Sequence, residues 1–225
     1  MKNKILSNSL NKAGVRELLR KTGEYMDTGK LNTVISISSL KLIRAMENEE
    51  YGRMIAAADM IIFDDVEVLK ALGLATSARI REVEEAKYLK ELLRKLVKEQ
   101  REIFLVADTG EQLDLLEKEL KGLQSNLNIV GLCTADSYFL DKEALVNTIN
   151  MTAPAVVLSR MASSGDLELL YEYGNYLNAS LWMVLPDRLA ENKNTGWLDK
   201  INKFIYKKLL NKKINHSKDT EKSDL

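Results

Sequence analysis

Short apolar segments alternate with amphipathic stretches along most of this 225-residue chain. Segments typical of buried strands are residues 34–37, 60–63, 102–107, 128–133, 155–159 and 181–185, and residues 78–83 alternate charged with apolar side chains like an edge strand. The strands lie about 15 to 25 residues apart, which is the spacing of a helical crossover between parallel strands. We therefore predict an α/β fold with an open, mostly parallel sheet and helices on both faces.

Amphipathic periodicity and capping residues predict the helices between these strands. They cover residues 12–26, 39–46, 48–58, 66–72, 84–98, 111–123, 141–150 and 166–176. A closed eight-stranded barrel usually needs about 250 residues, so an open sheet suits this length better. Residues 1–194 are predicted to form one domain, and residues 195–225 an appendage.

Charge and composition exclude several classes of site. Lys and Arg together number 33, as do Asp and Glu, so the net charge is zero and gives no overall attraction to nucleic acid. Cys133 is the single cysteine and lies in an apolar segment, which predicts a small core residue rather than a nucleophile. His216 is the single histidine and lies in a polar tail, which excludes histidine triads and histidine-rich metal sites. We expect no metal, no cofactor and a cytoplasmic protein.

The segment of residues 56–65 ends on two acids. Its apolar part, residues 60–63, is too short for a helix and suits a strand buried on both faces. Ligands of an open parallel sheet bind outside the carboxyl ends of the strands, where Asp64 would lie. Asp64 is therefore either a general base or the N-cap of the next helix, and the local sequence favours the cap. Asp64 and Asp65 also resemble a metal-binding pair, but no further ligands cluster with them.

Other polar residues follow the predicted strands or precede the predicted helices; they are Ser36, Ser38, Asp108, Thr109, Ser163 and Ser164. Thr109 and the glycine after it could present a helix start to a phosphate group, although a simple cap by Thr109 explains the same residues. Ser163 and Ser164 allow the same two interpretations. The sequence contains neither G-x-G-x-x-G nor G-x-x-x-x-G-K-[ST], the fingerprints of dinucleotide and P-loop sites.

Residues 195–214 have the pattern of a basic amphipathic helix. Trp197 lies on its apolar face, and the lysines around that face include Lys203, Lys207, Lys208 and Lys212. Such a helix can lie on an anionic membrane, which would place the protein on the inner face of the cell membrane. It can equally pack its apolar stripe against the domain and leave its lysines in water.

Four segments resemble one known family. Residues 47–64 look like the family's stretch leading to its Asp-Gly motif, residues 101–106 like its central strand and residues 127–131 like its next strand. Residues 137–139, with Tyr138 in the middle, look like its Gly-Tyr-Phe motif. The family is the WecG/TagA/CpsF glycosyltransferases, and the resemblance runs from about residue 14 to about residue 210. It implies a Rossmann-like fold and the transfer of a sugar from a nucleotide diphosphate donor.

The resemblance assigns roles to single residues and also shows departures. Asp64 matches the family's catalytic Asp, the proposed general base, but the following Gly is Asp65 here. The family's Thr-x-Asn strand end is Ser36-Ile37-Ser38, which keeps a hydroxyl and loses the amide. The Gly-Gly after the central strand is Ala107-Asp108, whose carboxylate would repel a diphosphate. The Pro-Lys-Gln-Glu motif falls on Ser163-Ser164-Gly165-Asp166, so its Lys and Gln are missing.

These matches imply a transferase that moves a hexose or N-acetylhexosamine from a UDP-sugar to a polyprenyl-linked acceptor in cell-surface polysaccharide synthesis. Asp64 would be the catalytic residue, and the expected substrate contacts are Ser36, Ser38, Asp65, Asp108, Thr109, Tyr138, Ser163 and Ser164. The basic appendage would bind the membrane surface. The alternative is a catalytically inactive relative that acts as a binding or scaffolding protein. Assembly into a homo-oligomer is compatible with either interpretation.

Overall fold

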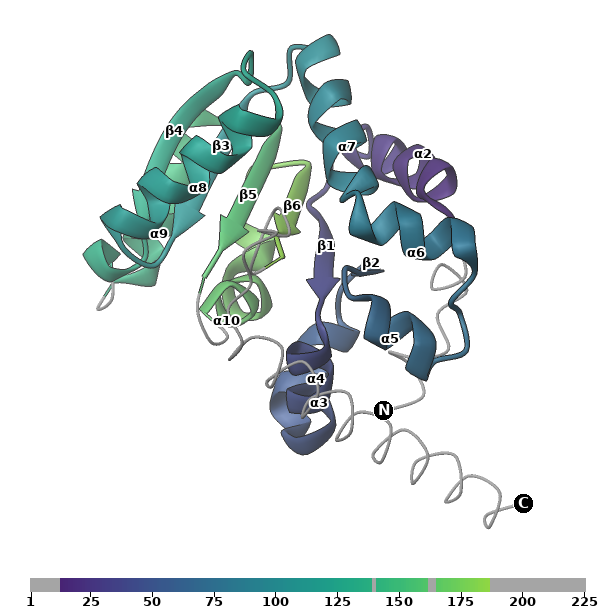
Figure 1. Cartoon of the computed structure of the whole chain (residues 1–225). Coiled ribbons are helices and arrows are strands. Elements are labelled where there is room, and N and C mark those ends of the chain that lie inside the picture. Colours follow the sequence, from purple (N-terminus) through teal and green to yellow (C-terminus); the bar gives the residue numbers. More distant parts are fainter. Residues whose placement is uncertain (1–12, 139–140, 162–164, 187–225) are drawn as a thin grey trace.

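The computed structural model describes residues 13–138, 141–161 and 165–186, and within these ranges six strands form one sheet. The strands are β1 (Asn32–Ile37), β2 (Met60–Phe63), β3 (Ile103–Ala107), β4 (Ile129–Thr134), β5 (Val156–Arg160) and β6 (Leu181–Val184). Their order across the sheet is β2-β1-β6-β5-β3-β4, and every neighbouring pair is parallel (Figure 1). The predicted open α/β sheet is confirmed, and in the described residues it is parallel throughout.

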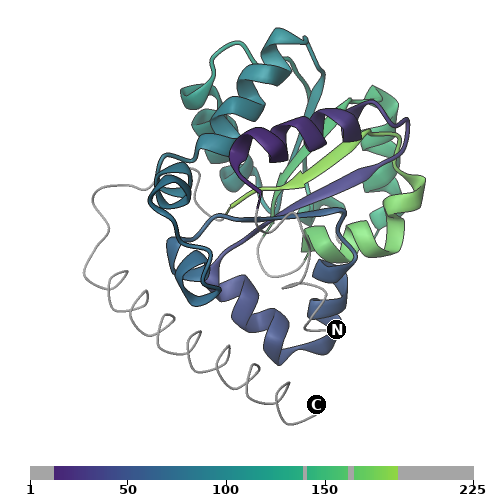
Figure 2. The ribbon, with the colours of Figure 1, turned by 90° about the vertical axis from the view of Figure 1, so that its right-hand side faces the viewer.

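Two layers of helices enclose this sheet. One layer contains α2 (Val15–Met26), α7 (Lys87–Lys98) and α8 (Gly110–Leu123), and α2 crosses in front of β6 and β1 in Figure 2. The other contains α3 (Ser39–Glu47), α4 (Glu49–Ala56), α5 (Val66–Ala71), α9 (Lys142–Thr152) and α10 (Gly165–Tyr173). Successive strand residues point to opposite layers, so Met60 packs with the first and Ile61 with the second. Both faces of the sheet are therefore buried, as the apolar strand sequences require.

Side-chain caps fix where many of these helices begin. Ser38, Asn48, Thr109 and Asp141 each accept a hydrogen bond from a backbone N–H in the first turn of the following helix. A cap of this kind is typically worth about 1 kcal/mol. The interpretation of Thr109 as a helix cap is confirmed, and Ser38, which precedes the predicted helix of residues 39–46, caps α3.

The prediction of an edge strand over residues 78–83 is wrong, because α6 (Ser77–Glu84) is a helix. The Thr76 hydroxyl accepts from the Arg79 N–H at 3.3 Å, and Ala, Arg and Glu, which favour helices, fill much of the segment. No residue of α6 is buried, so the apolar periodicity that identifies most helices is weak here. Ala86 then adopts a left-handed φ of 48° and separates α6 from α7, which begins three residues later than predicted.

The predicted basic helix of residues 195–214 lies outside the described residues, as do Trp197, Lys203, Lys207, Lys208 and Lys212. The predicted boundary after residue 194 lies there too. Among the helices of the described ranges, none has the length and apolar character needed to cross a membrane.

Two helical glycines should respond in opposite directions to the same substitution. A Cβ on Gly52 of α4 would stand 2.7 Å from the carbonyl oxygen of Ala45, so Gly52→Ala should lower the free energy of unfolding by about 1–3 kcal/mol. Nothing lies within 4 Å of a Cβ on Gly122 in α8, so Gly122→Ala should raise it by up to about 1 kcal/mol. Urea denaturation of both variants measures the two effects. Equal losses of stability would contradict the close contact assigned to Gly52.

Candidate functional site

The carboxyl ends of the six parallel strands meet along one edge of the sheet, outside which ligands of such folds bind. The predicted site residues within the described ranges lie in or just after β1 to β4; they are Ser36, Ser38, Asp64, Asp65, Asp108, Thr109 and Tyr138. Ser163 and Ser164 lie outside the described residues. The strand order separates the first four from the last three, because β6 and β5 lie between β1 and β3. Four strand spacings of about 4.8 Å put the strand ends that carry Asp64 and Asp108 roughly 19 Å apart.

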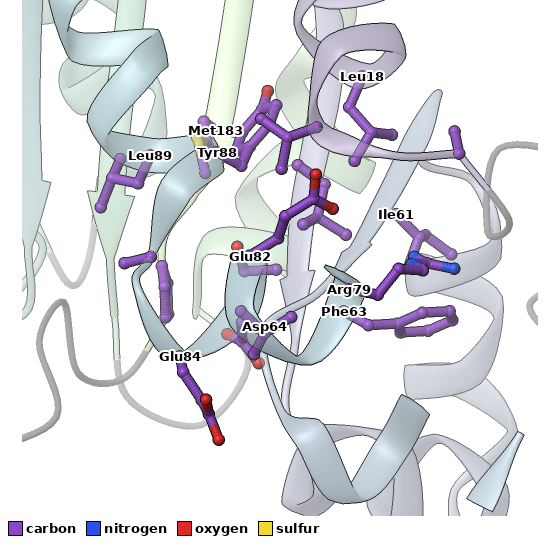
Figure 3. A pocket seen from close by; sticks show the side chains of 17 residues that line it. Leu18, Ile61, Phe63, Asp64, Arg79, Glu82, Glu84, Tyr88, Leu89 and Met183 are labelled. Carbon is purple, nitrogen blue, oxygen red and sulfur yellow. The ribbon is translucent and has the colours of Figure 1, made fainter. Parts of the chain in front are cut away.

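A pocket opens beside Asp64 at the end of β2, with a cavity volume of about 120 Å³. A single water needs roughly 10–15 Å³ on this scale, so the space suits several waters or one sugar-sized group. Most of its walls are apolar side chains of α2, β2, α7 and β6; they include Leu18, Ile61, Phe63, Leu89 and Met183 (Figure 3). Asp64 is half-buried, with its Oδ1 atom inside the protein, and Ser36 of β1 lines the same pocket. The structure thus brings two predicted site residues together.

Helix α6 contributes polar residues that the sequence did not identify as site residues, because a strand was expected there. Arg79, Glu82 and Glu84 all line the pocket. Arg79 is half-buried; this burial lowers the pKa of its guanidinium, while the charge of Glu82 raises it. The sequence feature that indicates helix α6 is Thr76, because its hydroxyl caps the helix-forming residues that follow it.

The ionisable residues of the pocket lining leave an excess of negative charge. Among the described residues of the lining, Arg79 has one formal positive charge, and Asp64, Glu82 and Glu84 have three formal negative charges, so their balance is −2. Tyr88 also lines the pocket but is neutral, because burial raises the pKa of its hydroxyl far above the physiological range. The described lining therefore combines apolar walls with more acidic than basic side chains.

Asp65 has a structural function that the sequence did not separate from that of Asp64. Its carboxylate accepts hydrogen bonds from the Ser39 N–H at 3.1 Å and from the Ser39 hydroxyl. It also accepts from the Glu67 N–H at 2.9 Å, which makes it the N-cap of α5. The helix cap considered for Asp64 is thus provided by Asp65, which does not line the pocket. Substrate contact by Asp65 stays a prediction.

The candidates near β3 and β4 form their own local contacts. The Thr109 hydroxyl accepts from the Gln112 N–H at 3.3 Å as a helix cap. The backbone oxygen of Asp108 accepts from the Asp136 N–H at 3.0 Å. The Tyr138 hydroxyl accepts a hydrogen bond from the Thr148 hydroxyl at 3.1 Å. None of these candidates lines the pocket beside Asp64, and their contact with a substrate stays a prediction.

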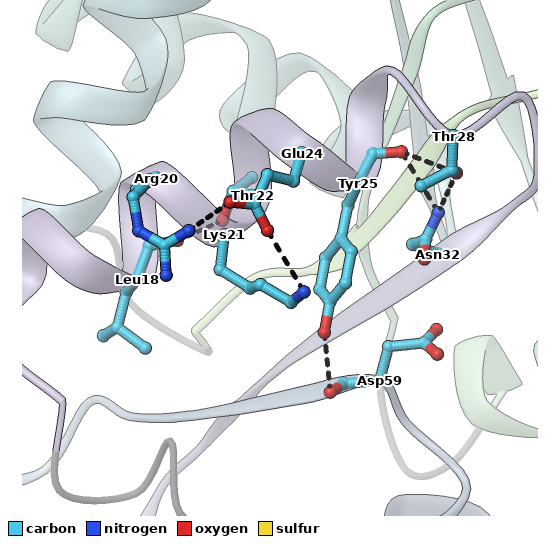
Figure 4. Close-up of polar contacts among 9 residues, drawn as sticks. All are labelled: Leu18, Arg20, Lys21, Thr22, Glu24, Tyr25, Thr28, Asn32 and Asp59. Carbon is cyan, nitrogen blue, oxygen red and sulfur yellow. Dashed lines mark hydrogen bonds and ion pairs between the residues drawn. The ribbon is translucent and has the colours of Figure 1, made fainter.

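Polar groups at the amino-terminal ends of β1 and β2 form hydrogen bonds that connect structural elements. The Tyr25 hydroxyl donates to the backbone oxygen of Asp59 at 3.1 Å, and the Asn32 amide donates to the backbone oxygen of Tyr25 at 3.1 Å and to the Thr28 hydroxyl at 2.7 Å (Figure 4). The Asp59 carboxylate accepts from the Thr33 N–H at 2.7 Å. These bonds tie α2 to the beginnings of β1 and β2, so the function of this cluster is structural.

A buried polar cluster lies at the end of β5. Asp166 is only 3% exposed, and its Oδ2 atom accepts from the Ser159 hydroxyl at 3.3 Å. Two backbone N–H groups also donate to its carboxylate, at 3.0 and 3.4 Å, and the Trp182 indole donates to the Ser159 oxygen at 2.8 Å. Burial raises the pKa of Asp166 to about 6, against the opposing effects of the Lys41 charge and these hydrogen bonds. The cluster therefore holds a carboxylate whose charge is disfavoured by folding.

Other reactive groups do not add to this site. Cys133 is buried in β4, and burial raises the pKa of its thiol to about 12, so the predicted core position is confirmed. Within the described ranges, no three His, Cys, Asp or Glu residues are grouped so that they could hold a metal ion.

One comparison with known proteins bears on this geometry. The family model described as "Glycosyl transferase WecG/TagA/CpsF family" matches residues 3–186 of the chain. The matched segment contains the whole sheet and the pocket beside Asp64.

The Asp166 carboxyl predicts a pH dependence of stability. Its pKa rises from 3.8 to about 6 on folding, so between these values the folded state binds more protons than the unfolded state. The stabilisation from this group is therefore present below about pH 4 and is lost as the pH rises through about 6, and the free energy of unfolding falls by about 3 kcal/mol. Asp166→Asn stays neutral, so the variant should gain stability relative to the wild type over this interval. Urea denaturation at several pH values measures the difference, and a constant difference would contradict a buried, titrating carboxyl.

Proposed function

Because the chain belongs to the WecG/TagA/CpsF glycosyltransferase family, we propose that it transfers a hexose or N-acetylhexosamine from a UDP-sugar to a lipid-linked acceptor in the synthesis of a cell-surface polysaccharide. The observation that carries this proposal is the Asp64 carboxylate, which stands at a strand end in a largely apolar pocket with room for a sugar-sized group. A carboxylate in such a position can take a proton from a substrate hydroxyl. Asp64 is the proposed general base, and Ser36 is a proposed substrate contact.

The proposed reaction places a hydroxyl group of the acceptor beside Asp64. The hydroxyl oxygen bonds to the anomeric carbon of the donor sugar while the bond from that carbon to the diphosphate oxygen breaks. The proton of the hydroxyl passes to Asp64, and the electron pair of the broken bond leaves with UDP. Only an ionised Asp64 can accept this proton, so the reaction depends on its carboxylate form.

The donor is proposed to lie along the strand-end edge, outside the pocket. Asp108 and Thr109 after β3, Tyr138 after β4, and Ser163 and Ser164 before α10 are its proposed contacts. The end of β3 is four strand spacings, roughly 19 Å, from that of β2, and this separation suits an elongated ligand such as a nucleotide sugar. The acceptor and the donor would then meet at the mouth of the pocket.

The lipid portion of the acceptor agrees with the proposed membrane association of residues 195–225. In this proposal, residues 1–194 form the catalytic domain and the lysine-rich segment binds the anionic inner face of the cell membrane. Trp197 would enter the interface, and Lys203, Lys207, Lys208 and Lys212 would contact lipid headgroups.

A second candidate function is that of an inactive relative that binds a partner. It is favoured by the pocket's charge balance of −2, which opposes the approach of a diphosphate. Asp65 adds to this argument, because the acid that follows Asp64 serves the junction of α3 and α5. A binding protein could keep the fold without needing either a donor or a base.

Asp64→Asn should lower the turnover number about 100- to 10,000-fold, with a smaller change in the Michaelis constant. The amide keeps the size of the side chain but cannot accept the acceptor's proton. UDP release from a panel of UDP-sugars, with a lipid-linked acceptor, measures the rate. Asp114→Asn is the control, because Asp114 is exposed on α8 and lies outside the pocket.

An absence of UDP release from every donor, with folded wild-type protein, would count against the transferase. Calorimetric titration with UDP then separates the two candidate functions. The transferase requires binding of UDP, whereas the inactive relative retains partner binding without nucleotide affinity and without dependence on Asp64.

The combined change Lys207→Glu, Lys208→Glu and Lys212→Glu should weaken sedimentation with anionic liposomes roughly 100-fold. Each lysine near an anionic surface is worth about 1 kcal/mol, so removing three loses about 3 kcal/mol before any added repulsion. Lys87→Glu, Lys98→Glu and Lys118→Glu form the matched control, because these lysines are exposed on α7 and α8. Unchanged sedimentation of the first variant would show that its lysines do not hold the protein on the membrane.

A further inference from the structure

The pocket beside Asp64 lies where both ends of the described chain meet the fold. Ala13, the first described residue, and Pro186, the last, both line it. Residues 1–12 therefore join the fold at this pocket, and so do residues 187–225. A segment that begins at the rim of a pocket can fill it with little chain, because only a short loop has to be ordered.

The side of this pocket next to α2 is apolar. Val15 and Leu18 of α2, Leu89 of α7 and Met183 of β6 form it, and Figure 3 shows the last three side by side with the rest of the lining. An apolar cavity of about 150 Å³ accepts a benzene-sized group. The volume of about 120 Å³ here therefore suits one branched aliphatic side chain. Filling it removes apolar surface from water on both partners, which is favourable.

Two observations favour the amino-terminal segment over the carboxy-terminal one as the occupant. The family match begins at residue 3 and ends at residue 186, so residues 3–12 belong to the matched domain and residues 187–225 do not. Residues 1–12 contain three lysines and no acidic residue, whereas residues 187–196 contain two acidic and two basic residues. The described lining has three carboxylates and one guanidinium, so its charges complement those of the amino-terminal segment.

The length of the segment allows it to reach the pocket. The large apolar side chains between residues 3 and 12 are Ile5, Leu6 and Leu10. Leu10 is three residues from Ala13, so even an extended chain keeps their Cα atoms within about 11 Å of each other. Lys12 precedes Gly14 by two residues, and the carboxylate oxygens of Glu82 lie 3.9 Å from the point that a Cβ on Gly14 would occupy. One short segment can thus present an apolar side chain and a positive charge to matching parts of the lining.

We propose that the amino-terminal segment docks on this pocket and that the side chain of Leu10 fills its apolar part. The segment then covers the approach to Asp64 from the side of α2. In the proposed reaction the acceptor has to displace Leu10, so the docked segment is an autoinhibitory contact. The docking itself does not depend on sugar transfer, because it involves only residues of this chain.

A double-mutant cycle in the full-length chain tests the contact. Val83 is half-buried on α6 and lines the pocket, whereas Val97 is half-buried on α7 and does not. Residues in contact give non-additive effects on stability, and separated residues give additive ones. In urea denaturation, we expect the effects of Leu10→Ala and Val83→Ala on the unfolding constant to depart from additivity at least threefold. Those of Leu10→Ala and Val97→Ala should be additive. Additive effects in both pairs would overturn the inference.

Disulfide formation provides a second test that does not require the alanine variants to fold. Cys133 is buried, and burial raises the pKa of its thiol to about 12, so it does not compete. Leu10→Cys combined with Glu82→Cys should oxidise at least tenfold faster than Leu10→Cys combined with Glu85→Cys. Glu85 is exposed just after α6 and does not line the pocket. Equal rates would overturn the inference, as would faster oxidation of Leu189→Cys with Glu82→Cys, which would assign the pocket to the carboxy-terminal segment.

Measurement of UDP release separates this inference from the proposed function. Coupling between Leu10 and Val83 in a protein that releases no UDP from any donor would support the docking and count against sugar transfer. Release of UDP by a protein in which the two residues are not coupled would overturn the docking and leave the transferase intact.

Discussion

The parallel pairing of β1 with β2 determines where the candidate base stands. Ile37 is paired with Phe63 at the end of the ladder, and the N–H of Asp64 still donates to the carbonyl oxygen of Ile37 at 3.3 Å. The first residue beyond β2 is therefore still held by the sheet. β1 lies between β2 and β6, and its residues 34–37 are buried. The position of Asp64 therefore depends on the pairing of β2 with the largely buried strand β1.

Two adjacent acids have different functions because an extended chain directs successive side chains to opposite faces. Met60 and Ile62 pack with the layer of α2 and α7, while Ile61 and Phe63 pack with the layer of α3 and α5. Continuing the alternation, Asp64 belongs to the first side and Asp65 to the second. The contacts agree, since Asp65 binds Ser39 at the start of α3 and caps α5. The charge of Asp65 is thus accommodated in a structural position, away from the pocket lining.

The sequence predicts the sheet well because its strands are buried on both faces, and such strands appear as apolar runs. Met60–Phe63 was predicted at its observed bounds for this reason. It predicts α6 poorly because no side chain of this helix is fully buried, so the segment has only a weak apolar period to reveal it. The same distinction between locally encoded and tertiary features applies to the candidate site. The strand-end position of Asp64 follows from local pattern and resemblance, whereas its meeting with Arg79 and Glu82 depends on how α6 folds back over the edge strand β2, which no local pattern encodes.

The two candidate functions differ in whether they need positive charge to hold the diphosphate of a donor. A diphosphate at the strand-end edge needs cations nearby, yet the basic side chains near the central strands are engaged elsewhere. Arg160 at the end of β5 forms an ion pair with Glu119, and Lys41 of α3 donates to the backbone oxygen of Leu185 at 3.4 Å. The six lysines between residues 200 and 213 are a further concentrated source of positive charge in the chain. Sugar transfer is therefore proposed to depend either on a donor that displaces these contacts or on charge supplied by the appendage, whereas a binding protein needs neither.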